Sequence, residues 1–382
     1  MQTDFLLLAI LWCYVGATFW QLLVCCGIFA RFACYPNEKN RLQEREKNTL
    51  PPPFSLIICA RNEAENLRLH LPVVLEQKYG GEWELLIVDD ASTDETPAVI
   101  RSLQEHYSCL KYVRLNEKHA PGKKYALQRG ISESNYDHLL LTDADCIPAS
   151  ALWLDQMSAA LTRKPETEIV LGYGPTLQTP GMLNRWIRFE TAHVAMQYSS
   201  FALAGMPYMG VGRNLAFQKA AFERVGRFDA HLHIPSGDDD LLVNAAANRR
   251  NTAVCVAPET FVYSEGKTTL RDWLHQKRRH LQASSVYHAR HQWLLASISL
   301  SLVFHYFLLL LLLLFSDDLL FPLLLYAVRM AVLFLIYKKA FYKLKCGDLL
   351  LWIPLLDIFM TVYHGIFVPY FLMAGRGFKE WK

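Results

Sequence analysis

The sequence predicts an α/β domain with a mostly parallel central sheet, which is covered by helices on both faces and flanked by transmembrane helices. Between residues 54 and 143, four short apolar runs alternate with helical stretches of about a dozen residues. Strands that are apolar throughout and alternate with helices are typical of a parallel sheet buried on both faces. The other apolar residues gather in long stretches at both ends of the chain, which explains a hydrophobic share of 52% in 382 residues.

The first long apolar stretch covers residues 5–30, contains no charge and can cross the roughly 30 Å hydrocarbon core of a bilayer. No Lys or Arg precedes it and no small-residue cleavage site follows it, so it does not have the form of a signal peptide. We therefore expect a transmembrane helix within residues 1–31 that stays in the protein, followed by a basic linker at 32–53.

A C-terminal membrane region is expected at residues 292–382. It holds apolar stretches near 293–315 and 319–337, which we interpret as two spans, and a third near 349–373. The third contains two prolines and Asp357, and non-helical backbone at membrane depth needs protein or water around it. A span, a broken helix and a re-entrant segment therefore all remain open for it.

The basic residues near the expected spans orient the chain, and they are Arg31, Lys39, Arg41, Arg45, Lys47, Lys338, Lys339, Lys343 and Lys345. The positive-inside rule puts the polar region between the spans in the cytoplasm and the N-terminus outside. A third C-terminal crossing would carry the basic tail at 375–382 outward. This conflict favours a re-entrant or interfacial segment at 349–373.

The composition and the absence of common motifs exclude several classes of protein. The net charge of +3 lacks the basic excess of a dedicated nucleic-acid binder, so no nucleic acid is expected as a partner. The nine cysteines contain no C-x-x-C pair, which indicates reduced thiols in a cytosolic compartment. No G-x-G-x-x-G follows the first strand, and no P-loop, G-x-S-x-G or H-E-x-x-H occurs.

The expected strands are 54–60, 83–90, 109–115 and 137–143, and the helices between them are 64–78, 94–107 and 122–134. Ligands of such sheets bind outside the carboxyl ends of the strands. Each of the four strands ends in polar residues, so we expect a binding site at that edge of the sheet.

Asp143 and Asp145 close the fourth strand and flank only Ala144. In extended chain both side chains leave the same side of the strand, so two like charges face each other. This arrangement costs energy unless a cation, a basic group or water compensates it. The sequence therefore predicts a bound group here, while a helix N-cap or a pair of solvated turn acids is the plainer interpretation.

Seven segments occur in the order of a known family, and they are SLIICARNEAENL (55–67), LLIVDDASTDET (85–96), GKKYAL (122–127), DADC (143–146), GRNLAF (212–217), GDDDL (237–241) and QKRRH (276–280). Together they resemble the membrane-bound inverting glycosyltransferases of family two. The resemblance implies a Rossmann-like, A-type glycosyltransferase fold that binds a nucleoside-diphosphate sugar. It places the cytoplasmic glycosyltransferase domain at 54–266 and an amphipathic interfacial helix at 267–291.

The resemblance also implies a divalent cation, Mn²⁺ or Mg²⁺, because a hard cation with oxygen ligands stabilises the charge that grows on a departing diphosphate. Asp143 and Asp145 match the family's Asp-x-Asp, whose second carboxylate usually holds the metal while the first contacts the nucleotide. The other implied donor contacts are Asp89 or Asp90 at the base, Arg61 and Glu63 over the nucleoside, and Lys123 near the phosphates or the carboxylates. Capping of helix starts is the plainer interpretation of the residues around the nucleoside.

The family's Glu-Asp-x-Asp-Leu motif falls on GDDDL, which puts Gly237 at the Glu and Asp238 at the catalytic Asp. In an inverting transfer this carboxylate removes the proton from the acceptor hydroxyl, whose oxygen attacks opposite the leaving diphosphate. Because the Glu is missing, the frame is ambiguous by one residue and Asp239 is the second candidate base. Three adjacent acids in a closed site also predict a raised pKa for one of them. An acidic first helical turn is the plainer interpretation.

QKRRH resembles Gln-x-x-Arg-Trp, in which the Gln and the Arg share a helix face. Gln276 and Arg279 then lie together with Arg278 beside them, and Arg279 would offer paired donors to the diphosphate. His280 replaces the Trp that normally lines the acceptor site. A basic helix lying on anionic lipid is the other interpretation, and both can hold together. The Trp, Phe and Met residues at 182–200 have helical spacing and predict core or membrane-interface packing.

The resemblance implies a metal-dependent enzyme that moves one hexose with inversion, from a UDP-sugar as the expected donor, to a lipid or lipid-linked acceptor. One span before the domain and two or three after it are similar to ceramide glucosyltransferases and small polysaccharide synthases. We expect an integral protein of the bacterial inner membrane with its catalytic domain in the cytoplasm. The alternatives are a processive polysaccharide synthase and a catalytically inactive membrane scaffold with the same fold.

Overall fold

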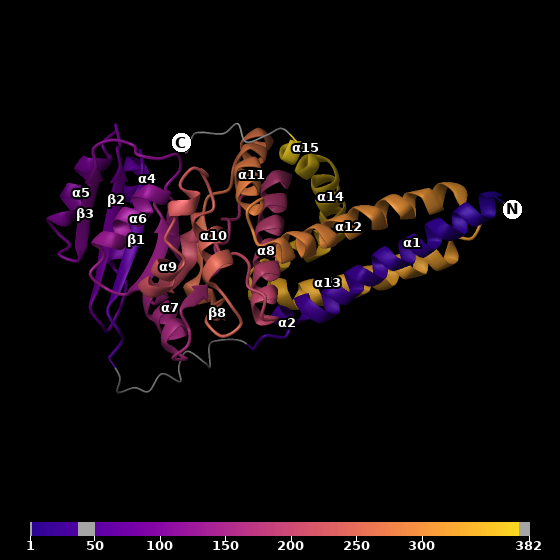
Figure 1. Cartoon of the computed structure of the whole chain (residues 1–382), viewed down its shortest axis with the longest axis horizontal. Coiled ribbons are helices and arrows are strands. Elements are labelled where there is room, and N and C mark those ends of the chain that lie inside the picture. The colour runs from indigo at the N-terminus through magenta and orange to yellow at the C-terminus, as the bar shows by residue number, and fades with distance from the viewer. Residues whose placement is uncertain (1, 37–49, 374–382) are drawn as a thin grey trace.

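A sheet-containing domain and a bundle of long helices form the two ends of an elongated molecule (Figure 1). The computed structural model describes residues 2–36 and 50–373. The linker residues Lys39, Arg41, Arg45 and Lys47 lie outside the described residues, as does the basic tail at 375–382.

The domain is built on a seven-stranded sheet with the strand order β3-β2-β1-β4-β7-β6-β8. Its strands are β1 (Phe54–Ala60), β2 (Trp83–Asp90), β3 (Leu110–Leu115), β4 (His138–Asp143), β6 (Ile169–Leu171), β7 (Leu215–Gln218) and β8 (Thr252–Val254). Of these, β7 runs antiparallel to both neighbours, and the other pairs are parallel. This confirms the predicted class of a mostly parallel sheet. A second, two-stranded sheet pairs β5 (Cys146–Pro148) with β9 (Val262–Ser264).

Helices cover both faces of the sheet, as the apolar strands predict. They are α4 (Ala64–Leu75), α5 (Thr96–Gln104), α6 (Lys124–Glu133), α7 (Trp153–Thr162), α9 (Lys219–Arg224) and α10 (Asp238–Ala246). Alternate residues of β1 reach the two layers. Leu56 and Ile58 pack in the core formed with α4, α5 and α7, whereas Ile57 and Cys59 pack in the core formed with α6.

The predicted strands and helices agree with the structure except at their ends. The strands expected at 109–115 and 137–143 begin one residue later, and the three helices between the strands are shorter. At the helix expected from residue 94, the Asp94 Oδ1 accepts a hydrogen bond from the Thr96 amide at 2.9 Å. This side chain caps the turn, so α5 begins after it, with Pro97 in its first turn.

Three long helices form the membrane bundle (Figure 1). They are α1 (Gln2–Val24), which continues through a π-helical turn (Cys25–Phe29) into α2 (Ala30–Ala33), α12 (Ala289–Phe315) and α13 (Leu320–Lys343). By length and apolar composition, four segments can cross a membrane: Phe5–Ala33, Ala289–Phe315, Leu320–Lys343 and Gly347–Phe371. Large apolar side chains such as Trp12, Phe307 and Leu324 are more than half exposed on the bundle, which fits contact with lipid.

The third C-terminal stretch is a broken helix. It consists of a 3₁₀-helical turn (Gly347–Trp352), α14 (Ile353–Val362), a π-helical turn (Tyr363–Phe367) and α15 (Val368–Met373). The segment curves beside the part of the bundle nearest the sheet domain, whereas α12 and α13 extend to the far end (Figure 1). The irregular turns fit the expected broken helix. Whether the segment spans the bilayer, as the length of Gly347–Phe371 allows, or re-enters it stays a prediction.

Two helices lie crosswise between the sheet domain and the bundle, α8 (Met182–Leu203) and α11 (Leu270–Ser284) (Figure 1). They contact each other through Trp186 and Trp273, whose ring centroids are 5.7 Å apart. Trp186 also contacts Phe359 of α14, at 6.1 Å between centroids. The aromatic residues of α8 therefore pack between domain and bundle, as their spacing predicted.

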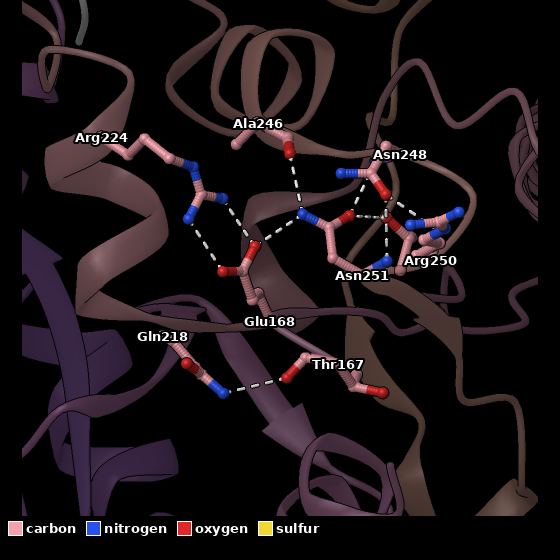
Figure 2. A network of polar contacts seen from close by, with 9 residues as sticks. Thr167, Glu168, Gln218, Arg224, Ala246, Asn248, Arg250 and Asn251 are labelled. Carbon is pink, nitrogen blue, oxygen red and sulfur yellow. Dashed lines mark hydrogen bonds and ion pairs between the residues drawn. The ribbon is translucent and has the colours of Figure 1, made fainter. Parts of the chain in front are cut away.

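A network of polar contacts connects β6 and β8 to the helices beside them (Figure 2). The Glu168 carboxylate, just before β6, accepts two hydrogen bonds from the Arg224 guanidinium of α9, at 2.8 and 2.6 Å. Asn251, just before β8, donates to Glu168 at 2.7 Å and to the Ala246 carbonyl of α10 at 3.0 Å. The network joins α9, α10 and β8 to β6, and it thereby fixes the helix that carries the candidate base.

Replacing Asn251 by Ala tests this network. The side chain is buried, with 5% exposed. Its loss leaves the Ala246 carbonyl without this donor, whereas Glu168 keeps its hydrogen bonds from Arg224. We therefore expect the free energy of unfolding to fall by about 1 to 3 kcal/mol. Arg224→Ala is the matched control, because its ion pair is half exposed and should contribute about 0 to 1 kcal/mol. Thermal unfolding of the solubilised full chain measures both, and equal losses would contradict the assignment.

Candidate active site

One cavity of about 1500 Å³ begins at the carboxyl ends of β1 and β4 and continues between α8 and α11 into the membrane bundle. Cys59 and Asp143, which are paired in the register of these two strands, line its sheet end. Of the residues expected in the site, Glu63, Lys123, Asp143, Asp145, Asp238, Asp239, Gln276 and Arg279 line this cavity. Arg61, Asp89, Asp90 and Arg278 are not part of its wall.

The Lys123 ammonium lies between two carboxylates that come from different motifs. Its Nζ is 2.7 Å from Asp143 Oδ1 and 3.1 Å from Asp238 Oδ2. Burial would lower the pKa of Lys123, but the carboxylates of Asp143 and Asp238 outweigh burial and raise it well above its usual value. Burial would raise the pKa of Asp143, but Lys123 outweighs burial there and holds it below its usual range. The Lys123 ammonium thus compensates the negative charges of Asp143 and Asp238.

Two glycines allow these motifs to approach each other. Gly122 has a φ of +77°, and a Cβ there would lie 2.1 Å from the carbonyl oxygen of Pro235. Gly237 has a φ of +78°, and a Cβ there would lie 2.5 Å from the Cβ of Ala283 in α11. Only glycine meets both conditions without strain or displacement. The start of α6 can therefore contact the loop before α10, and α10 can contact α11.

The Asp145 carboxylate is not in the ion pairs of Lys123, so it can bind a cation. One ligand atom each of Asp143, Asp145 and Cys146 lies within 4.8 Å of the others. Carboxylate oxygens suit Mn²⁺ and Mg²⁺. Burial, followed by the charge of Asp143, raises the pKa of the Cys146 thiol well above its usual value, so the thiol stays protonated. The donor set therefore fits a hard divalent cation held by the carboxylates.

The three acids that begin α10 have different surroundings. Asp239 accepts hydrogen bonds from the Gly212 amide at 2.5 Å and from the Asp240 amide at 2.9 Å, so it holds the loop before β7 against α10. Burial, followed by the charge of Asp238, raises the pKa of Asp239 to about 6. Burial and the charge of Asp239 also raise the pKa of Asp240 well above its usual value. In the part of the chain that the structure describes, Asp238 accepts no backbone hydrogen bond and faces Lys123 instead.

α11 presents Gln276 and Arg279 to the cavity, one helical turn apart, as the motif predicts. Arg278 falls on another face of the helix because successive residues are about 100° apart, and the expectation that it contacts substrate has no support here. His280 lines the cavity in place of the family's Trp. Burial, the largest cause, acts with the charges of the neighbouring Lys277 and Arg279 to lower the pKa of His280.

The two acids that end β2 have different roles in the structure. Asp89 is fully buried and accepts hydrogen bonds from the Ser92 amide at 2.9 Å and from the Tyr112 hydroxyl at 2.8 Å. It therefore serves the turn after β2. Burial raises the pKa of Asp90, against the charges of Lys118 and Arg61. Basic side chains lie near both acids, since Arg114 Nε is 3.9 Å from Asp89 Oδ2. Asp90 is also buried, with 2% exposed, and contact of either acid with a ligand stays a prediction.

Arg213 is a residue of the cavity wall for which no role is predicted from the sequence. It lines the cavity and donates to the Ser264 hydroxyl at 2.9 Å and to the Gly174 carbonyl. Its charge adds to that of Lys123 in lowering the pKa of Asp143. Arg213 belongs to the GRNLAF segment, which the sequence comparison with the family already singles out. Its position beside Asp143 and Asp145 follows from the pairing of β4 with β7.

Protein-family models match two overlapping parts of the chain. Glycosyl transferase family 2 matches residues 55–189, and Glycosyl transferase family group 2 matches residues 138–369, well over half of the chain. These matches define the class of protein as that of the glycosyl transferases. The chain belongs to glycosyl transferase family group 2.

Two relatives and one solved structure illustrate the similarity. The beta-monoglucosyldiacylglycerol synthase of Synechocystis sp. is 30% identical over 252 residues, which are 64% of this chain and 50% of that protein. The poly-beta-1,6-N-acetyl-D-glucosamine synthase of Staphylococcus aureus is 33% identical over 94 residues, which are 25% of this chain and 22% of that protein. The chain thus spans half or less of the length of these relatives.

The mannosyltransferase PcManGT from Pyrobaculum calidifontis, solved in complex with GDP-Man and Mn²⁺, has the same fold. Its TM-score is 0.54 at 17% identity, over 94% of this chain and 99% of that one.

Asp145→Asn tests the metal assignment. We expect it to abolish the stabilisation by nucleotide that depends on Mn²⁺, because a hard cation loses a charged oxygen ligand. Cys146→Ser is the matched control and should keep this stabilisation, since the protonated thiol is not a ligand. A thermal-shift titration with UDP or GDP, with and without Mn²⁺, measures both variants. Normal Mn²⁺-dependent stabilisation of the Asp145 variant would contradict the assignment.

Asp239→Asn tests the raised pKa of this acid. The folded chain holds the Asp239 proton up to about pH 6, above the ordinary value of 3.8, so its contribution to stability falls as the pH rises through this window. The Asn side chain does not titrate. The Tm of the variant minus the Tm of the unchanged protein should therefore increase from pH 4 to pH 6, and a constant difference would contradict the assignment.

Proposed function

We propose that the protein transfers one hexose, with inversion, from a nucleoside-diphosphate sugar to a lipid or lipid-linked acceptor at the cytoplasmic face of a membrane. The observation that carries this proposal is the single cavity that joins the carboxylates bridged by Lys123 to the membrane bundle. A UDP-sugar is the proposed donor, and Mn²⁺ or Mg²⁺ is the proposed cation.

Asp238 is the proposed base. It lines the cavity, and Lys123 holds its carboxylate in place at 3.1 Å. The carboxylate takes the proton of the acceptor hydroxyl while that oxygen forms a bond to the anomeric carbon. The bond from this carbon to the diphosphate breaks on the opposite side, which inverts the centre.

The donor lies on the other side of the anomeric carbon in this proposal. Asp145 and Asp143 would hold the cation, which would supply positive charge to the departing diphosphate. Arg279 donates paired hydrogen bonds to the diphosphate, with Gln276 beside it. The nucleoside lies toward the end of β2, near Asp90. Arg61 and Glu63 are further proposed contacts.

The proposed membrane is the bacterial inner membrane, with the sheet domain in the cytoplasm. The end of α13 nearest the sheet domain carries Lys338, Lys339 and Lys343, which supports this side under the positive-inside rule. Lys343 also donates to the carbonyls of Phe32 and Tyr35, both at 2.6 Å, so the basic ends of two spans meet. The name of the Synechocystis relative, a synthase of a glucosylated diacylglycerol, supports a lipid acceptor.

A processive polysaccharide synthase is the second candidate. It is favoured by the 33% identity to the poly-beta-1,6-N-acetyl-D-glucosamine synthase, although this covers only 94 residues. The two candidates differ in product length, since one transfer gives one product and repeated transfer gives a series. An inactive scaffold with the same fold would bind nucleotide without turnover.

Asp238→Asn tests the base, with Asp239→Asn as the matched control. A panel of nucleotide sugars is first given to the full chain with membrane lipid and Mn²⁺ or Mg²⁺, and release of nucleoside diphosphate identifies the donor. With that donor, Asp238→Asn should lower kcat about 10²- to 10⁴-fold and leave donor affinity nearly unchanged. Asp239→Asn should keep measurable transfer.

The opposite result for the two variants would move the base to Asp239. Absence of release with every donor would contradict the proposed function and favour the scaffold. A product series of increasing length would favour the synthase.

A further inference from the structure

An ion pair crosses the middle of the cavity, between the catalytic carboxylates and the membrane bundle. Lys277 Nζ of α11 lies 2.5 Å from Glu190 Oε2 of α8. Both side chains line the cavity and are mostly buried, with 15% and 7% exposed. Neither belongs to the donor site proposed above.

A structural role alone does not account for this pair. Removing two charges from water costs about as much as their attraction returns, so apolar side chains would join α8 to α11 at least as well. Trp186 and Trp273 already make such a contact between the two helices, at 5.7 Å. The charged pair in the cavity wall is instead suited to bind polar groups that enter the cavity.

A second polar group at the same place lacks a partner. The indole Nε1 of Trp273 is buried and has no hydrogen-bond partner among the described residues. This residue is 2% exposed and lines the cavity, and Lys277 Nζ lies 5.9 Å from the centroid of the ring. A buried N–H without an acceptor is costly, and an incoming oxygen would remove that cost.

The membrane half of the cavity offers no spare cation to a phosphate. Among the described residues that the membrane segments and α8 contribute to its wall, Arg329 is the one lysine or arginine. Its Nη1 is 2.6 Å from Asp357 Oδ2, and its Nε donates to Gln21 at 2.6 Å. Lys277 is likewise neutralised by Glu190. Within the part of the wall that the membrane segments and α8 contribute, a phosphate headgroup would therefore meet two carboxylates and no unpaired cation. Lys267 and Arg279 belong to the rest of the wall, toward the sheet domain and on α11.

We propose that Glu190, Lys277 and the Trp273 indole bind the headgroup of an uncharged lipid acceptor that carries neighbouring hydroxyl groups, as glycerol and sugar headgroups do. The Glu190 carboxylate accepts hydrogen bonds from hydroxyls, and Lys277 and Trp273 donate to hydroxyl or ring oxygens. This inference rests on the proposed function and names its acceptor class.

Photoaffinity labelling of the full chain in nanodiscs tests this headgroup preference without turnover. The probes are a diacylglycerol and a polyprenyl phosphate that each carry a diazirine, in competition with the same lipid without it. We expect the diacylglycerol probe to label the cavity wall in a competable way. Glu190→Gln should weaken this labelling about tenfold, because a hydrogen bond to a charged group is lost. The same variant should strengthen labelling by the phosphate probe, because Lys277 is released.

Asp348→Asn is the matched control. It breaks another ion pair of α8, between Arg188 and Asp348 at 2.7 Å, which lies outside the cavity wall. It should leave labelling by both probes unchanged. The double variant Glu190→Gln with Lys277→Gln leaves no unpaired charge, so it should keep the Tm and still lose diacylglycerol labelling.

Stronger competable labelling of the unchanged protein by the phosphate probe would overturn the inference. So would equal diacylglycerol labelling of the Glu190 and Asp348 variants. Release of nucleoside diphosphate is recorded separately. Release without diacylglycerol labelling would contradict the headgroup site and leave the proposed function. Labelling without release would contradict the proposed function and leave the headgroup site.

Discussion

The sheet end of the cavity depends on the Lys123 ammonium between Asp143 and Asp238. Without this cation, carboxylates from β4 and α10 would face each other in a mostly buried space, and one of them would have to take up a proton or turn toward solvent. Because Gly122 lets the loop approach closely, one lysine holds together two segments that are far apart in the chain. It also leaves Asp145 for a cation and keeps Asp238 at the cavity.

Paired charges recur along the whole cavity. Lys123 has its carboxylates at the sheet end, Lys277 has Glu190 between the crosswise helices, and Arg329 has Asp357 in the bundle. Lys277 and Glu190 come from helices that are distant in sequence, and Lys123 also pairs with Asp238 of the distant α10. Since an uncompensated charge is costly in such surroundings, the pairs fix how the sheet domain, the crosswise helices and the bundle fit around one space.

The sequence predicts those elements that depend on the spacing of residues within one short segment. The strands β1 and β2, the acids at the end of β4 and the start of α10 follow from period and spacing. The distinction between Asp89 and Asp90 depends on Tyr112 of the neighbouring strand, and the role of Arg213 depends on the antiparallel β7. The meeting of Glu190 with Lys277, and the broken form of the last segment, arise from packing between distant elements, which linear spacing does not record.

The pair formed by Arg329 and Asp357 has a consequence for biosynthesis. Arg329 belongs to α13, and its partner belongs to the segment that follows, so a chain that enters the bilayer in order delivers the guanidinium first. A lone arginine in the middle of a membrane helix disfavours insertion by about 2.5 to 3.5 kcal/mol. Asp357 of α14 supplies the counter-charge, so a chain that stops short of it would leave the Arg329 guanidinium with the Gln21 side chain of α1 as its partner.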